Sequence, residues 1–82
     1  MTETIHVAAY DNVAAIQQRL ARYHNTRVAL VLADDARQLA NPVRLELLAR
    51  QAHRQQIALA VVTRQLSTLD ACRDAGVSAF VS

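Results

Sequence analysis

The sequence has no lysine and only one glycine, one proline and one cysteine among its 82 residues. A phosphate-binding loop needs several glycines and a lysine, and a dinucleotide-binding turn needs three glycines, so neither motif can form. Schiff-base chemistry, which requires a lysine, is excluded as well. The lone cysteine, Cys72, rules out an internal disulfide bond and a cysteine-based zinc site, and it is typical of a protein in the reducing cytoplasm.

Charge and aromatic side chains are also sparse. The formal net charge is +2, the nine basic residues are all arginine and are scattered, and the aromatic residues are Tyr10, Tyr23 and Phe80. A nucleic-acid interface requires clustered basic residues, with aromatic side chains for single strands, so we expect no nucleic-acid partner. The apolar run 28–33 is far shorter than the ~20 residues of a membrane span, so we expect no membrane insertion by this segment. A longer parent protein could still be tethered to a membrane.

Four segments are rich in β-branched and aliphatic residues, as strands are. They are residues 4–10, 27–33, 57–62 and 77–81. The first partly alternates between apolar and polar residues, which indicates a half-buried strand. The second and third are apolar without alternation, which is typical of strands covered on both faces. We therefore place the second and third strands at the centre of a sheet and the first and fourth at or near its edges.

Start signals between these segments predict three helices. Asp11 is expected to cap the first helix, and Asn41 is expected to cap the second, with Pro42 at its first helical position. Ser67 and Asp70 have the spacing of a capping box at the start of the third.

The resulting order, β-α-β-α-β-α-β, predicts one α/β domain over residues 1–82. Strands that alternate with helices pair in parallel through right-handed crossovers, so we expect a four-stranded, mostly parallel sheet. The two wholly apolar strands imply helices on both faces of that sheet, and therefore three layers. Gly76 is expected to end the last helix, because that position often requires a positive φ.

Candidate binding residues follow the strands, because ligands of open α/β sheets bind at the carboxyl ends of the strands. The segments expected there are residues 10–12, 34–41 and 63–67, together with Ser82. Their candidate ligand-binding residues are Asp11, Asp34, Asp35, Asn41, Thr63, Arg64 and Ser67.

Two chemistries are open at this edge of the sheet. Asp34 and Asp35, with Asp11 as a third ligand, could hold Mg²⁺, or all three could be turn and cap residues. Thr63 and Arg64, beside the start of the third helix, could bind an anion such as phosphate, or could be a turn and a solvated arginine. We assign no metal ligand on this pattern.

The sequence contains no recognisable catalytic constellation. His6, His24 and His53 share no metal-ligand spacing. Cys72 has no neighbouring histidine and is expected on the inward side of the third helix, which favours a small buried hydrophobic residue over a nucleophile. We therefore expect a protein that is not an enzyme and has no cofactor.

Three stretches carry a family resemblance: Asn41-Pro-Val-x-Leu-x-Leu-Leu-Ala-Arg50, Ala60-Val-Val-Thr-Arg64 and Ala75-Gly-Val77. Together with the apolar run 28–33, they resemble a small uncharacterised α/β domain found near the N-terminus of bacterial, often membrane-anchored, proteins. No activity is established for that family, so this resemblance implies the fold alone.

The order of elements is also similar to that of the anti-sigma-factor antagonist (STAS) family. That family carries a phosphorylatable serine at the start of the helix after its central strand. Here Asn41 and Pro42 occupy that place, and no serine or threonine lies between Ala33 and Arg50. The similarity therefore implies no phosphorylation switch in this chain.

These observations favour a non-catalytic protein-interaction or regulatory module, and the alternative is a domain that binds a small ligand, an anion or Mg²⁺. The expected partner is another protein or a second copy of the chain. The fourth strand carries no charge or proline to protect an exposed edge. We therefore predict a homodimer whose contact includes the fourth strand, with Val77, Ala79, Phe80 and Val81, or the neighbouring third helix. The alternative is that the fourth strand lies inside the sheet and the first strand, with its polar His6, forms the edge.

Overall fold

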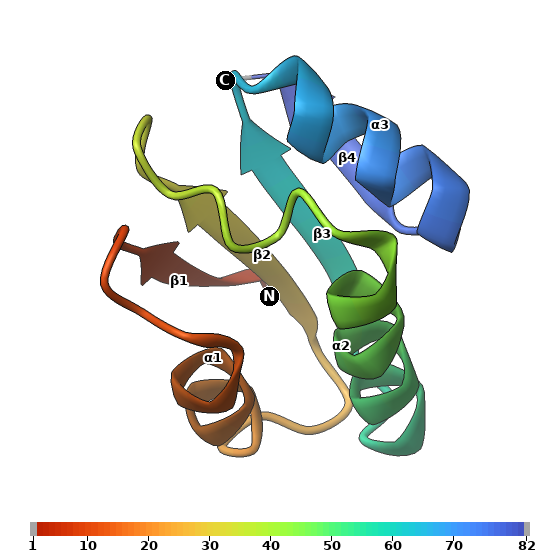
Figure 1. Cartoon of the computed structure of the whole chain (residues 1–82). Coiled ribbons are helices and arrows are strands. Elements are labelled where there is room, and N and C mark those ends of the chain that lie inside the picture. The colour runs from red at the N-terminus through yellow and green to blue at the C-terminus, as the bar shows by residue number, and fades with distance from the viewer. Residues whose placement is uncertain (1, 82) are drawn as a thin grey trace.

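The computed structural model describes residues 2–81, which form four strands and three helices (Figure 1). In chain order, the elements are β1 (Thr2–Val7), α1 (Val13–Leu20), β2 (Arg27–Leu32), α2 (Pro42–Arg54), β3 (Ala58–Thr63), α3 (Leu66–Ala75) and β4 (Ser78–Val81). The predicted alternation of strands and helices is confirmed, and the chain has an α/β fold.

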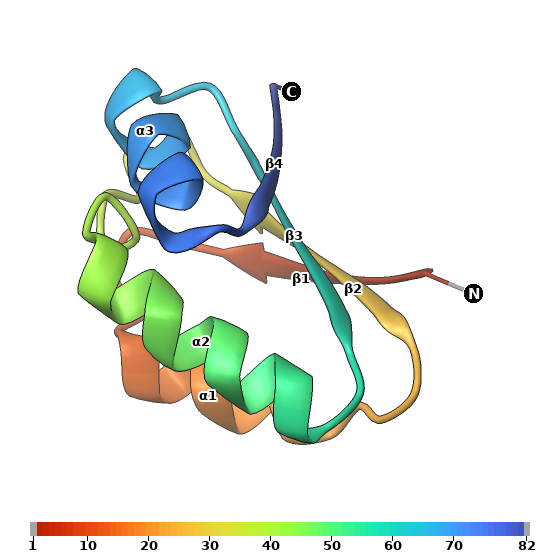
Figure 2. The same cartoon turned by 90° about the vertical axis from the view of Figure 1, so that its right-hand side faces the viewer.

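The four strands form one sheet in the order β1-β2-β3-β4, and every neighbouring pair is parallel. β2 and β3 are therefore central, and β1 and β4 are the edges, as predicted. The three helices all lie on one face of this sheet (Figure 2). The prediction of helices on both faces was wrong for residues 2–81, where the fold has two layers.

The strand order explains why there are two layers instead of three. Each right-handed crossover advances by one strand in the same direction, so successive helices fall on the same face. Helices reach both faces only where the direction of the strand order reverses. The apolar runs were misleading because β2 and β3 carry small or β-branched side chains on the uncovered face. These residues, Ala29, Val31, Ala60 and Val62, are half-buried there.

The core lies between the sheet and the helix layer. Leu30 of β2 and Val61 of β3 are fully buried in it, together with Ile16 of α1 and Leu45 of α2. Cys72 of α3 belongs to the same cluster and is fully buried, which confirms its predicted inward position. Burial of a large aliphatic side chain contributes about 2 kcal/mol, so this cluster is what holds the helices on the sheet.

Two of the local signals are confirmed. The side chain of Asn41 accepts a hydrogen bond of 2.9 Å from the backbone N–H of Val43, and α2 begins at Pro42. Gly76 follows α3 with φ = 72°, in the left-handed region that favours glycine.

The other two helix starts differ from the prediction. α1 is capped by Asn12, not Asp11, through a hydrogen bond of 2.8 Å to the Asn12 side chain from a backbone amide three residues later. α3 begins at Leu66 with Gln65 at its cap position, so Ser67 lies inside the first turn and the predicted capping box does not form. The actual cap is the next residue after Asp11 at α1, and it lies two residues before Ser67 at α3.

Candidate functional site

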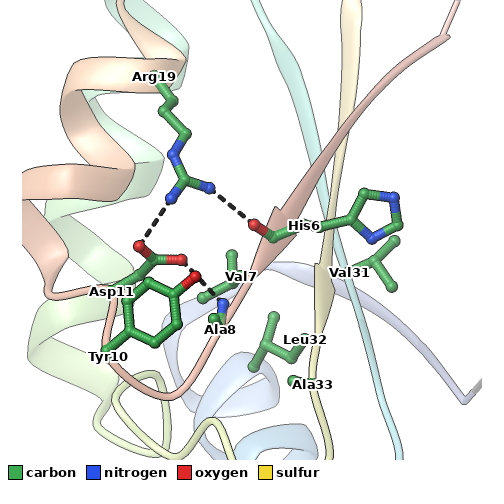
Figure 3. A pocket seen from close by; sticks show the side chains of 9 residues that line it. All are labelled: His6, Val7, Ala8, Tyr10, Asp11, Arg19, Val31, Leu32 and Ala33. Carbon is green, nitrogen blue, oxygen red and sulfur yellow. Dashed lines mark hydrogen bonds and ion pairs between the residues drawn. The ribbon is translucent and has the colours of Figure 1, made fainter.

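Asp11 lies after the carboxyl end of β1 and is only 7% exposed. Its Oδ2 accepts a hydrogen bond of 2.8 Å from the backbone N–H of Ala8, and its Oδ1 pairs with the Arg19 guanidinium at 2.7 Å (Figure 3). The hydrogen bond from Ala8 and the contact with Arg19 hold the pKa of Asp11 below its ordinary value, against the opposing effect of burial. Asp11 is thus a brace within the β1–α1 turn, and this contact explains why it does not cap α1.

A hollow of about 440 Å³ lies beside this brace. It is lined by the ends of β1 and β2, the turn after β1 and Arg19 of α1 (Figure 3). Arg19 also donates a hydrogen bond of 2.7 Å to the carbonyl oxygen of His6. The charged lining residues, Asp11 and Arg19, are therefore bound to each other and to the backbone, and we assign this hollow no ligand.

The segment 34–41, which the sequence places at the carboxyl end of a strand, is anchored in the protein. Its residues Ala36 and Leu39 are fully buried. The side-chain amide of Gln65 donates hydrogen bonds of 2.8 Å to the carbonyl oxygens of Asp34 and Ala36. The segment is therefore tied to the loop between β3 and α3.

A second glutamine ties the same segment to the β1–α1 turn. The side-chain amide of Gln38 donates a hydrogen bond of 2.8 Å to the carbonyl oxygen of Ala8 and another to the carbonyl oxygen of Asp11. Sequence reasoning missed both Gln38 and Gln65, because neither belongs to a local motif and their partners are distant in the chain. The three loops at the carboxyl edge of the sheet are thus braced against one another.

The structure disperses the remaining candidate residues. Asp34 and Asp35 are exposed, as are Arg64 and Ser67. Thr63 is buried, and its Oγ1 accepts a hydrogen bond of 3.1 Å from the backbone N–H two residues later. Asn41 serves as the cap of α2 described above.

No group of three or more histidine, cysteine, aspartate or glutamate side chains within residues 2–81 is arranged to hold a metal ion. Asp11 is thus not brought together with Asp34 and Asp35 as a third ligand. Ser82 lies outside the described residues. Ligand binding at Asp34, Asp35, Thr63, Arg64 and Ser67 stays a prediction.

The face of the sheet opposite the helices carries side chains that are in register across the strands. One row, here called the small row, consists of Thr4, Ala29, Ala60 and Ser78. The next row towards the carboxyl ends, here called the large row, consists of His6, Val31, Val62 and Phe80. A hollow of about 350 Å³ lies over the amino-terminal half of this face, where its lining includes Ala29, Ala58, Ala60 and Ser78.

The residues predicted for self-association divide between the two faces. Val77 and Ala79 pack against the core on the helix side. Phe80 belongs to the large row and is 59% exposed, and Val81 is exposed at the end of the edge strand. Phe80 is therefore the member of this group that is continuous with the uncovered face.

Comparisons of the chain with protein-family models, with curated proteins and with solved structures found no match. The resemblances drawn from the sequence stay predictions. None of the helices in residues 2–81 has both the length and the apolar character required to cross a membrane.

Proposed function

We propose that this chain is a non-catalytic protein-interaction domain of the cytoplasm and that the uncovered face of its sheet is the binding surface. The observation that carries the proposal is a parallel sheet with helices on one face only. All-parallel sheets occur almost always with both faces covered, so the second face of this sheet requires a protein surface to cover it.

The composition of the face supports the same function. Its centre is uncharged and consists of Ala29, Val31, Ala60 and Val62. Charge is found at the perimeter, at Arg27 at the amino end of β2. An apolar centre with a polar rim is the usual anatomy of a protein–protein interface. By contrast, Asp11, Gln38 and Gln65 at the carboxyl edge are engaged in holding the loops together.

Site-specific photo-crosslinking in cells tests this function. A benzophenone side chain at position 80 reports on the uncovered face, and one at position 66, on the helix side, is the matched control because Leu66 is 77% exposed. We expect a protein adduct from position 80, none from position 66, and loss of the adduct in Val62→Asp but not in the shape-conserving Val62→Thr. Circular dichroism checks that both variants fold. Absence of an adduct at position 80, or equal adducts from both positions, would overturn the proposal.

A further inference from the structure

We infer that the partner covering this face is a second copy of the chain, stacked face to face with its strands antiparallel to those of the first. The inference rests on the proposed function, because it names the occupant of the same surface. It is carried by two features of the uncovered face: the pairing of the small row with the large row, and the distribution of charge along β2.

The two rows make the face complementary to itself. A twofold axis that lies in the plane of the face, runs across the strands and passes between the rows places each strand over its own counterpart in the reverse direction. The large row of each copy then lies over the small row of the other, with Val62 over Ala60 and Phe80 over Ser78. A symmetric dimer requires one patch to fit itself in this way. Sheets that pack face to face interdigitate their side chains at a spacing of about 10 Å, so bulky residues need small ones opposite them.

The same axis brings opposite charges together. Arg27 lies one row before the small row, so it falls over position 33 of the second copy, two residues beyond Val31. Asp34 and Asp35 follow at once, and all three charged side chains are exposed. The proposed stack therefore predicts two symmetric contacts between Arg27 and this acidic pair, which follows the carboxyl end of β2, at opposite ends of the interface.

Other arrangements of two copies satisfy fewer of these features. A twofold axis parallel to the strands would place the large rows on each other and bring the two Arg27 side chains towards the same end. Pairing along the edge of β4 would satisfy backbone groups of Ser78–Val81, but it would leave the apolar centre of the face exposed. Of these three arrangements, only the antiparallel stack covers the face, sets bulky residues over small ones and brings Arg27 towards the acidic pair.

The size of the face sets the strength of the dimer. Four strands about 4.8 Å apart and three rows about 7 Å apart, the third being the row of Thr2, Arg27 and Ala58, give a footprint of about 400 Å² per copy. A stable interface buries about 800 Å² per partner, so we expect a weak, concentration-dependent dimer. Measurements must therefore extend from low to several hundred micromolar.

A charge-swap experiment on the purified chain tests the arrangement. Sedimentation equilibrium is run on the wild type, on Arg27→Glu, on the double variant Asp34→Arg/Asp35→Arg, and on an equimolar mixture of the two variants. Each variant alone places like charges at both contacts and is expected to weaken the dimer by about tenfold. In the mixture, every contact of a heterodimer joins opposite charges, so the heterodimer is expected to form as strongly as the wild-type dimer. The positions are exposed, and circular dichroism checks that each variant is folded.

A monomeric wild type over this range would overturn the inference, and so would a wild-type dimer in which the variants associate unchanged or the mixture gives no preferred heterodimer. The photo-crosslinking experiment separates these outcomes from failure of the proposed function. An adduct from position 80 with a different protein leaves the interaction domain standing and removes the second copy as its partner.

Discussion

The side-chain amide of Gln65 donates a hydrogen bond of 2.8 Å to the carbonyl oxygen of Ala36, twenty-nine residues earlier in the chain. Its second amide hydrogen reaches the carbonyl oxygen of Asp34, and its Oε1 accepts a hydrogen bond from the hydroxyl group of Thr68. Gln65 therefore engages its side chain fully in holding two loops together. Gln65 is thus one of the polar side chains at the carboxyl edge of the sheet, where many α/β proteins bind ligands, that here make internal contacts.

Replacing Gln65 is therefore expected to destabilise the fold. Gln65→Ala removes three hydrogen bonds and should lower the free energy of unfolding by about 2 kcal/mol, since a typical bond contributes about 1 kcal/mol and the carbonyl groups are partly solvated once it is lost. Gln65→Glu keeps the volume but sets carboxylate oxygens against two carbonyl oxygens, and should cost at least as much. Urea denaturation measures both. The control is Gln18→Ala, an exposed glutamine of α1; a loss of equal size there would contradict the brace.

The predictions that succeeded depend on neighbouring residues. Asn41 and Pro42 define a helix start within two residues, and Gly76 is required where the chain turns out of α3 with positive φ. The brace formed by Gln65 could not be predicted, because nothing near it in sequence indicates a partner at Ala36. Local signals also fail where two polar residues compete: Asn12 and Asp11 are both good caps, and the contact of Asp11 with Arg19 decides between them.

The layer arrangement shows a second limit of sequence patterns. Alternate residues of a strand point to opposite faces of the sheet, so an apolar run contributes side chains to both faces. It predicts burial of both faces only if the side chains on each face are too large and apolar to remain partly exposed. Val28 and Leu30 point into the core, whereas Ala29 and Val31 point to the uncovered face and are half-buried. Small and β-branched residues suit either environment, so the run in β2 did not distinguish two layers from three. The apolar pattern indicated only which strands are central and which lie at the edge. The full strand order β1-β2-β3-β4 is what distinguishes two layers from three.

Acid should weaken the fold partly through Asp11. Its pKa in the folded protein is lowered, first by the hydrogen bond from Ala8 and then by Arg19. The unfolded chain therefore takes up the proton first as the pH falls through the ordinary aspartate range near ~4, and the stability that Asp11 contributes above this range is lost as the pH falls further through the folded-state pKa.

Asp11→Asn tests this linkage. The variant should be less stable than the wild type at pH 7, and its stability should fall less steeply on acidification, so that the two converge at low pH. Urea denaturation between about pH 7 and pH 2.5 covers the window. Asp70→Asn is the control, because its ion pair with Arg73 is exposed on α3 and contributes little. Parallel stability curves for the wild type and Asp11→Asn would contradict the assignment.

Cys72 should resist thiol reagents in the folded protein. It is fully buried, and burial raises the pKa of its thiol, so both access and the thiolate population are reduced. We expect modification at neutral pH to be slower than in the unfolded chain by about a hundredfold or more, because it requires local opening. A chromogenic disulfide reagent measures the rate. Ser67→Cys in a Cys72→Ala chain is the control, since Ser67 is exposed on the same helix; equal rates at the two positions would contradict the burial.

The acidic pair Asp34–Asp35 distinguishes a turn from a metal site. Both side chains are exposed, and the structure uses the backbone carbonyl group of Asp34 in the hydrogen bond from Gln65. Asp34→Ala and Asp35→Ala, alone or together, are therefore expected to change the free energy of unfolding by less than about 1 kcal/mol, as surface substitutions do. The measurement is made well below the concentration at which copies associate, so that a dimer contact does not contribute.

Thermal melts with and without millimolar Mg²⁺ then decide the alternative function. A turn predicts the same melting temperature in both conditions for the wild type and the double variant. If Mg²⁺ raised the melting temperature of the wild type alone, the carboxylates would be metal ligands, because a ligand that binds only the folded state stabilises it in proportion to the logarithm of its saturation.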